Sequence, residues 1–167
     1  MKAYLDRLKG RLEDAGAACP VFLMHSGGGI ISLESAAAFP VRLVESGPAG
    51  GAIFAAEVAA RHQLDKVLSF DMGGTTAKIC LIQGQTPKTA RVFEVARSYR
   101  FKKGSGMPIS IPVIGMVAIG AGGGSLAHVD NLRQIRVGPE SAGSEPGPAC
   151  YGRGGLRPAV TDADLIM

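Results

Sequence analysis

The segment Phe70-Asp71-Met72-Gly73-Gly74-Thr75-Thr76-Ala77-Lys78 lies between two apolar runs and predicts a tight turn joining two strands. Two glycines let the backbone approach a ligand without interference from a Cβ atom. Successive N–H groups in such a turn form a concavity that favours phosphate oxygens, and a carboxylate suits a hard cation such as Mg2+. The candidate site therefore has Asp71 as its metal-facing carboxylate and Gly73, Gly74, Thr75 and Thr76 as its cradle.

A structural alternative exists for the same segment. Asp and Gly are also favoured in a type I′ hairpin turn, where they serve only to adopt positive φ angles. The segment is neither a Walker A loop, for which Lys78 is misplaced, nor a dinucleotide fingerprint, because a strand and not a helix follows it.

Upstream of this turn, the order strand, glycine loop and helix repeats, which indicates an α/β layer fold with ligand loops along one edge. Ser46, Gly47 and Gly50 lie in a second glycine loop just before a helix expected over residues 52–61. Free N–H groups and the dipole at such a helix start favour an anion, although an ordinary strand-to-helix connection is the alternative. The other upstream elements expected are helices at residues 2–15 and 33–38, the first closed by Gly16, and strands at residues 21–24, 41–44 and 67–70.

Downstream of Gln83 the helical periodicity disappears and short β-rich runs follow. Residues 138–158 are nearly all glycine, proline, serine and small side chains, which predicts a long loop. We therefore divide the chain into an α/β part, residues 1–83, and a β-rich, loop-rich part, residues 84–167. The last residues predict the start of a helix with Thr161 as its N-cap, and both ends are expected to be internal to a longer protein.

Composition excludes several classes of protein. A hydrophobic fraction of 46% with 19% charged residues indicates a folded globular chain. The 24 glycines follow no collagen-like period. The 3 cysteines are far apart and form no CxxC spacing, which argues against a disulfide framework or a metal site and fits the reducing cytoplasm. No run approaches the ~18 apolar residues that span a bilayer, so no membrane partner is expected.

Other features each have two interpretations. The basic run at residues 91–103 contains Tyr99 and Phe101, as a nucleic-acid surface does, but a charged hairpin edge is favoured, and no nucleic-acid partner is expected. His128 and Asp130 are expected to form a surface pair in preference to a catalytic dyad. Cys150 has no basic neighbour in sequence to activate it as a nucleophile. Four glycines within residues 120–125 indicate either a close-approach loop or a flexible turn.

The succession of these motifs resembles the hydantoinase A/oxoprolinase family, and the resemblance covers essentially the whole chain. It rests on 26–29 (SGGG), 46–51 (SGPAGG), 70–78 (FDMGGTTAK), 119–125 (IGAGGGS), 137–143 (VGPESAG), 146–152 (PGPACYG) and 160–163 (VTDA). Two positions depart from the family's usual pattern: Gly115 replaces an acidic residue and Ala159 replaces a threonine.

The resemblance implies a lobe similar to the actin, sugar kinase and Hsp70 (ribonuclease H-like) ATPases, followed by a β-rich, Gly/Pro-rich segment. It implies ATP and Mg2+ as cofactors, with residues 71–76 as the second phosphate loop and Asp71 as the catalytic residue that orients Mg2+ or the attacking oxygen. The implied activity is ATP-driven activation of a cyclic amide or carbonyl substrate, and the implied partners are a hydantoinase B-type subunit and further segments of the same polypeptide. Since the family's other nucleotide loops have no counterpart here, a non-catalytic protein-interaction module is the alternative.

Overall fold

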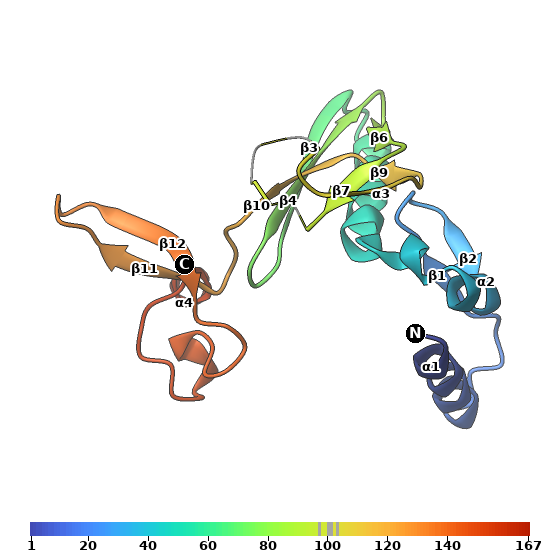
Figure 1. The fold of residues 1–167 in the computed structure, drawn as a ribbon, viewed down its shortest axis with the longest axis horizontal. Coiled ribbons are helices and arrows are strands. Elements are labelled where there is room, and N and C mark those ends of the chain that lie inside the picture. The colour runs from blue at the N-terminus through green and yellow to red at the C-terminus, as the bar shows by residue number, and fades with distance from the viewer. Residues whose placement is uncertain (97, 100–101, 103) are drawn as a thin grey trace. The chain divides into compact units, whose positions relative to one another are not determined.

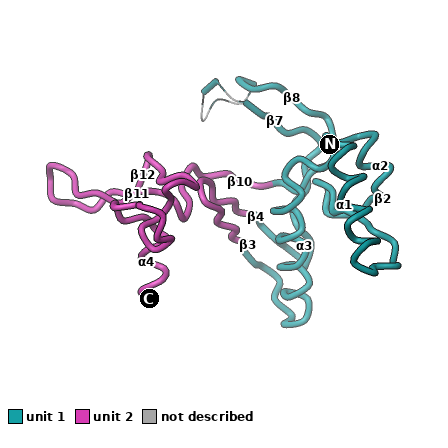
Figure 2. The backbone as a smooth tube through the Cα atoms, turned by 90° about the horizontal axis from the view of Figure 1, so that it is seen from below, with its two compact units in different colours: residues 1–69, 80–115 teal, residues 70–79, 116–167 magenta. Residues whose placement is uncertain are grey.

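The computed structural model describes residues 1–96, 98, 99, 102 and 104–167. These residues form two compact units (Figure 2): unit 1 comprises residues 1–69 and 80–115, and unit 2 comprises residues 70–79 and 116–167. The division differs from the border predicted after Gln83, because the end of one predicted hairpin belongs to unit 2. Arg97, Arg100, Phe101 and Lys103 of the basic run lie outside the described residues.

Unit 1 begins with a helix–hairpin–helix segment (Figure 1). Gly16 has a φ of +83° just beyond the first helix, as its predicted C-capping role requires. The second helix begins where the Ser32 hydroxyl accepts a hydrogen bond from the Ser35 amide at 3.2 Å. The elements of this segment are α1 (Lys2–Asp14), β1 (Phe22–Met24), β2 (Ile30–Ser32), α2 (Leu33–Ala38), η1 (Pro40–Leu43) and α3 (Ser46–Arg61).

Two predictions for this segment are wrong. The strand expected at residues 41–44 is the 3-10 turn η1, because Pro40 presets a helical φ at its first position. The helix expected from residue 52 begins at Ser46, so the predicted glycine loop forms the first turns of α3. Tertiary packing overrides the low helix propensity of its glycines, since α3 buries a stripe of alanines: Ala49, Ala52, Ala56 and Ala59.

The core of this segment is small. Leu5 of α1 packs with Leu33 and Ala36 of α2, and partly buried apolar side chains of β1, β2 and η1 surround them. Ser26, buried between β1 and β2, donates its hydroxyl to the Arg42 carbonyl at 2.7 Å and its amide to the same oxygen at 2.8 Å. These bonds fix the 26–29 loop of unit 1 against η1.

The central hairpin is formed as the sequence predicts. β3 (Lys66–Met72) and β4 (Ala77–Gln83) flank the 71–76 turn in a four-stranded sheet of order β10-β4-β3, with β5 paired to β4. Cys80 and Ile82 of β4 are buried, whereas Leu81 between them is 57% exposed. This alternation is that of a strand with one buried face. The remaining short strands of unit 1 are β5 (Thr86–Pro87), β6 (Thr89–Ala90), β7 (Phe93–Val95), β8 (Met107–Ile109) and β9 (Val113–Ile114).

Unit 2 contains a β-hairpin and a short helix in addition to the end of the central hairpin. The hairpin pairs two strands antiparallel, with a register shift between Ser125 and Ala127. The second of these strands extends into the stretch predicted as a long loop, which is therefore partly ordered by strand pairing. The elements are β10 (Met116–Ile119), β11 (Ser125–Val129), β12 (Ile135–Ser141), η2 (Ala149–Tyr151) and α4 (Val160–Ile166).

Candidate functional site

The 71–76 turn is closed by one backbone hydrogen bond, from the Gly73 amide to the Thr76 carbonyl at 3.0 Å. A type I′ turn needs positive φ at both central residues. Neither Gly74 nor Thr75 has a φ in that range, and Gly73 does not either. The structural alternative for these glycines is therefore wrong.

Space does not require glycine here either. A Cβ built on Gly74 meets no atom within 4 Å, and one on Gly73 meets only the Thr76 carbonyl at 3.5 Å, an ordinary contact. Both residues are exposed. Among the described residues, neither backbone angle nor packing explains the Gly-Gly pair, whereas an open backbone is what close approach of a ligand needs.

The turn also offers hydrogen-bond donors. Within the part of the chain that the structure describes, the amides of Gly74 and Thr75 donate to no protein acceptor. Asp71 lies just before them, near the end of β3, and is exposed. The described residues contain no group of three His, Cys, Asp or Glu side chains that could hold a metal alone. A single exposed carboxylate beside an open glycine turn nevertheless fits Mg2+, which is usually bound by one or two carboxylates together with substrate phosphates.

The 120–125 loop lies directly against this turn. The Gly123 amide donates to the Gly73 carbonyl at 2.9 Å, and the Gly124 amide donates to the Gly74 carbonyl at 2.8 Å. A Cβ on Gly122 would lie 2.5 Å from the Gly73 carbonyl oxygen and 2.6 Å from the Thr75 nitrogen. Gly122 and Gly124 are buried. The loop is thus a packed element whose glycines make room for the backbone of the 71–76 turn.

The start of α4 joins the same cluster. The Thr161 amide donates to the Gly123 carbonyl at 2.8 Å. Thr161 is not the N-cap that the sequence predicts: Ala159 occupies that position, and the capping carboxylate comes from Asp162, which accepts a hydrogen bond from the Ala159 amide at 2.7 Å. Asp162 also accepts from the Cys150 amide at 2.7 Å. The Ala159 amide, then the Cys150 thiol and the Cys150 amide, lower the pKa of Asp162 to about 2 by hydrogen bonding to its carboxylate.

The second predicted anion site lies in unit 1. Ser46 and Gly47 are the first two residues of α3, and Ala49 already donates to the Glu45 carbonyl at 3.1 Å. Gly50 is the fifth helical residue, so the argument from a free amide before the helix no longer applies to it. Ser46 and Gly47 keep the predicted placement at a helix start, in a different unit from the 71–76 turn.

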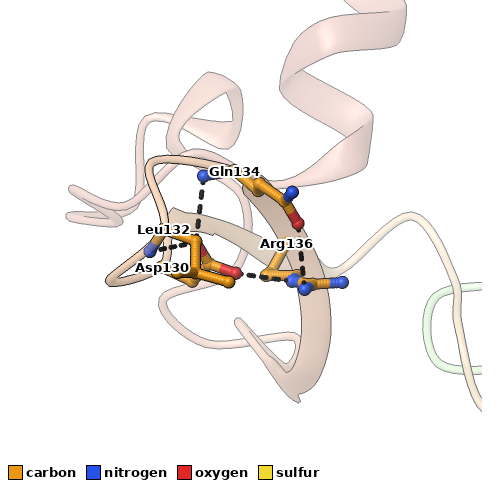
Figure 3. Close-up of polar contacts among 4 residues, drawn as sticks. All are labelled: Asp130, Leu132, Gln134 and Arg136. Atoms are coloured by element: carbon orange, nitrogen blue, oxygen red, sulfur yellow. Dashed lines mark hydrogen bonds and ion pairs between the residues drawn. The ribbon is translucent and has the colours of Figure 1, made fainter.

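The Asp130 carboxylate forms its hydrogen bonds within the turn of the β11–β12 hairpin (Figure 3). Its carboxylate accepts the amides of Leu132 at 2.8 Å and Gln134 at 2.9 Å, and it pairs with Arg136 Nε at 2.8 Å. The pKa of Asp130 is lowered, first by the Gln134 amide and then by the Arg136 guanidinium. The carboxylate thus orders the hairpin turn, which agrees with a surface role and not with a catalytic dyad with His128.

Cys150 is not activated as a nucleophile. It is exposed, and the pKa of its thiol is raised, first by its hydrogen bond to Asp162 and then by desolvation and the negative charge of the same residue. A raised pKa keeps the thiol protonated at neutral pH. Cys80 is buried and Cys19 is exposed, and both are free.

Sequence reasoning missed the support of the turn. The run of glycines at residues 120–125 was visible but had no assigned contact, and the acidic residue three positions after Ala159 was a usable helix-start signal for Asp162. Neither signal says which distant backbone the residues contact.

The chain has a mixed α/β fold with an exposed glycine turn, and comparison with known proteins identifies its family. The hydantoinase/oxoprolinase family model matches residues 1–167, so the chain belongs to that family. The chain is 37% identical over 167 residues to the caprolactamase subunit alpha of Pseudomonas jessenii, covering 100% of this chain and 23% of that protein. It is 42% identical to an uncharacterized protein of Methanocaldococcus jannaschii, covering 100% of this chain and 24% of that protein.

Solved structures agree. The ATP-dependent caprolactamase of Pseudomonas jessenii aligns with a TM-score of 0.62 at 34% identity, covering 98% of this chain and 22% of that one. Nucleotide-free acetone carboxylase aligns with a TM-score of 0.71 at 24% identity, covering 99% of this chain and 22% of that one. This likeness supports the mixed α/β fold. The chain therefore spans about a quarter of the length of these relatives. In the part of the chain that the structure describes, no helix combines the length and apolar character needed to cross a membrane.

Proposed function

We propose that this chain contributes a phosphate-binding turn, residues 71–76, to an ATP-dependent enzyme of the hydantoinase/oxoprolinase type. The observation that carries the proposal is the Gly73-Gly74 pair: it is exposed, it has no positive φ, and it has no neighbour that requires glycine. A phosphate oxygen bound by the amides of Gly74 and Thr75 accounts for both glycines, because a methyl group at either position reduces the space for close approach.

The proposed lobe is of the actin, sugar kinase and Hsp70 type. Two relatives support the use of ATP, since the caprolactamase is described as ATP-dependent and acetone carboxylase as carrying out ATP-dependent acetone carboxylation. In this chain, the exposed Asp71 carboxylate is the residue that would hold Mg2+, which supplies neutralisation of phosphate charge. Ser46 and Gly47 are proposed as further anion contacts at the start of α3, with the helix dipole as their electrostatic basis.

The proposed reaction activates a cyclic amide or carbonyl substrate. The terminal phosphoryl group passes from ATP to the substrate oxygen and ADP leaves. With a cyclic amide, water adds to the activated carbon, the ring C–N bond breaks to give an acyl phosphate and an amine, and a second water converts the acyl phosphate to a carboxylate and inorganic phosphate. The 71–76 turn contributes by positioning and by electrostatic stabilisation, which is how phosphoryl transfer is catalysed in general. Hydantoins, 5-oxoproline and ketones are the substrate classes proposed. The proposed setting is the cytoplasm, and the proposed partner is a B-type subunit; a partner subunit is supported by two relatives that are named as subunits, a caprolactamase subunit alpha and an acetophenone carboxylase gamma subunit.

A second candidate function is a protein-interaction module without catalysis. The observation in its favour is the β11–β12 hairpin, where Leu132 is 75% and Ile135 is 76% exposed although the turn between them is ordered by Asp130. Exposed apolar groups on an ordered turn are suited to burial against another protein surface.

Calorimetric titration with Mg-pyrophosphate, Mg-ATP and Mg-AMP separates the two functions. The phosphate proposal predicts weak binding of pyrophosphate and ATP, with Kd values of about 1 mM, little or no binding of AMP, and loss of both signals in Asp71→Ala. Absence of heat in a chain shown to be folded by circular dichroism contradicts the phosphate proposal. Equal binding by Asp71→Ala contradicts the role of the carboxylate.

A further inference from the structure

We propose that the 120–125 loop, with the start of α4, positions the backbone of the 71–76 turn for phosphate, and that Gly122 is its central positioning residue. The inference rests on the proposed function, because positioning has a purpose only if the turn binds a ligand. It assigns a role to a glycine loop that lies about 50 residues downstream of the turn in sequence.

The first argument is the direction of the peptide groups. The carbonyls of Gly73 and Gly74 accept hydrogen bonds from the supporting loop: from the Gly123 amide at 2.9 Å and from the Gly124 amide at 2.8 Å, respectively. A peptide unit is planar, so fixing a carbonyl also fixes the amide of the next residue on the opposite side of that unit. The held carbonyls thereby orient the amides of Gly74 and Thr75, which have no protein acceptor among the described residues.

The second argument is the distribution of space. In the 71–76 turn, a Cβ on Gly74 meets nothing within 4 Å, whereas a Cβ on Gly122 would lie 2.5 Å from the Gly73 oxygen and 2.6 Å from the Gly74 carbonyl carbon. The contacting atoms are backbone, so they cannot swing aside as a side chain would. Packing therefore requires a glycine at Gly122 in the supporting loop. It does not require one at Gly74, which lies in the turn that is proposed to face the ligand.

The third argument is that the supporting loop is itself held. Its own turn is closed by the Ser125 hydroxyl, which is buried and accepts the Gly122 amide at 3.0 Å. The Gly124 carbonyl accepts the Ala142 amide at 2.7 Å, and the Gly123 carbonyl accepts the Thr161 amide at 2.8 Å. Ala142, the residue that follows β12, and Thr161 of α4 thus both anchor the loop that contacts the 71–76 turn.

Thr161 allows a test by rescue. A methyl group on Gly123 would lie 2.6 Å from Thr161 Oγ1, but its other neighbours, Thr161 Cβ and the Gly73 oxygen, are 3.9 Å away. Gly123→Ala should therefore displace the loop, and the second substitution Thr161→Ala should remove the clash. Gly122→Ala has no such partner, because its clash is with backbone atoms.

The experiment measures the Gly74 and Thr75 amide resonances of four variants by two-dimensional NMR, with and without Mg-pyrophosphate. The variants are Gly122→Ala, Gly123→Ala, Gly123→Ala/Thr161→Ala and the control Gly51→Ala, whose new Cβ on α3 meets nothing within 4 Å. The wild type and the control should bind equally. Gly122→Ala and Gly123→Ala should bind about tenfold more weakly or worse, as expected for a cradle displaced by about an ångström, and the double variant should recover.

Hydrogen exchange of the Gly123 and Gly124 amides is measured in the same samples. Rapid exchange in the single variants, with protection restored in the double variant, supports the positioning role. Unchanged pyrophosphate affinity in Gly122→Ala, with its Gly73–Thr76 resonances in place, overturns it and leaves the proposed function intact. If the wild type itself does not bind, the proposed function fails, and unmoved Gly74 and Thr75 resonances in Gly122→Ala then also overturn the contact itself.

Discussion

Substitution of Gly74 by alanine separates a glycine kept for binding from one kept for folding. Gly74 has no positive φ, and a Cβ there meets no atom within 4 Å. The free energy of unfolding should therefore change by less than about 0.5 kcal/mol, or rise by about 0.4–1 kcal/mol through the lower entropy of the unfolded chain. Urea denaturation followed by circular dichroism measures this change.

The same substitution should weaken phosphate binding. A methyl group on the exposed side of the turn interferes with one charge-assisted hydrogen bond, worth about 1.5–3 kcal/mol, which corresponds to a loss of about 10- to 100-fold in affinity for Mg-pyrophosphate.

The control for Gly74→Ala is Gly122→Ala, which should lower the free energy of unfolding where Gly74→Ala leaves it nearly unchanged or raises it. The new methyl overlaps backbone atoms, and overpacking of this kind costs about 1–3 kcal/mol of unfolding free energy. A loss of more than about 1 kcal/mol of unfolding free energy in Gly74→Ala refutes the argument that the fold does not require this glycine. Full pyrophosphate affinity in Gly74→Ala refutes the argument that its backbone faces the ligand.

Three further predictions concern the core, the pH dependence of stability and the reactivity of a cysteine. Ile82→Ala should lower the free energy of unfolding by about 2–5 kcal/mol, because the side chain is 2% exposed, while Leu81→Ala, 57% exposed, should change it by less than about 0.5 kcal/mol; a similar loss in both contradicts the strand orientation. The pKa values of Asp162 and Asp130 are lowered in the folded state, so the stabilisation that these carboxylates give is complete above the unfolded-state pKa of about 3.9 and disappears as the pH falls, for Asp162 through a folded-state pKa of about 2. On acid titration, Asp162→Asn should therefore lose less unfolding free energy than the wild type does. The same loss in both proteins counts against the capping role of Asp162. Alkylation of Cys150 by iodoacetamide should be faster in Asp162→Asn, because the hydrogen bond and charge that raise the thiol pKa are removed, and an equal or slower rate rejects that cause.

Local patterns in the sequence were sufficient for the central hairpin and the first helices. Apolar runs flanking a Gly-Gly turn predicted β3 and β4, and periodic leucines before Gly16 predicted α1. These elements depend on residues close in sequence, so pattern and turn chemistry describe them well.

Two local predictions failed where packing competes with propensity. Residues 41–44 have the apolar character of a strand, but Pro40 and the two hydrogen bonds from Ser26 to the Arg42 carbonyl select a 3-10 turn. Glycines at positions 47, 50 and 51 indicated a loop, whereas burial of Ala49 and Ala52 extends α3 through them. Intrinsic preference is a weak guide when a small buried face decides the outcome.

The candidate site was only half visible in the sequence. The chemistry proposed for Asp71, Gly73, Gly74 and Thr75 is inferred from their order along the chain. The support of the turn by Gly122 and Gly123 does not, because it depends on backbone contacts between segments about 50 residues apart, and sequence pattern alone carries no information on such pairings.

The central claim is that phosphate binds to the backbone of the 71–76 turn, and a map of NMR amide shifts on addition of Mg-pyrophosphate to the wild-type chain tests it most directly. The claim predicts that the largest shifts fall on Gly74 and Thr75, the two turn amides with no acceptor among the described residues. Shifts confined to other segments, such as the start of α3 at Ser46 and Gly47, would contradict it.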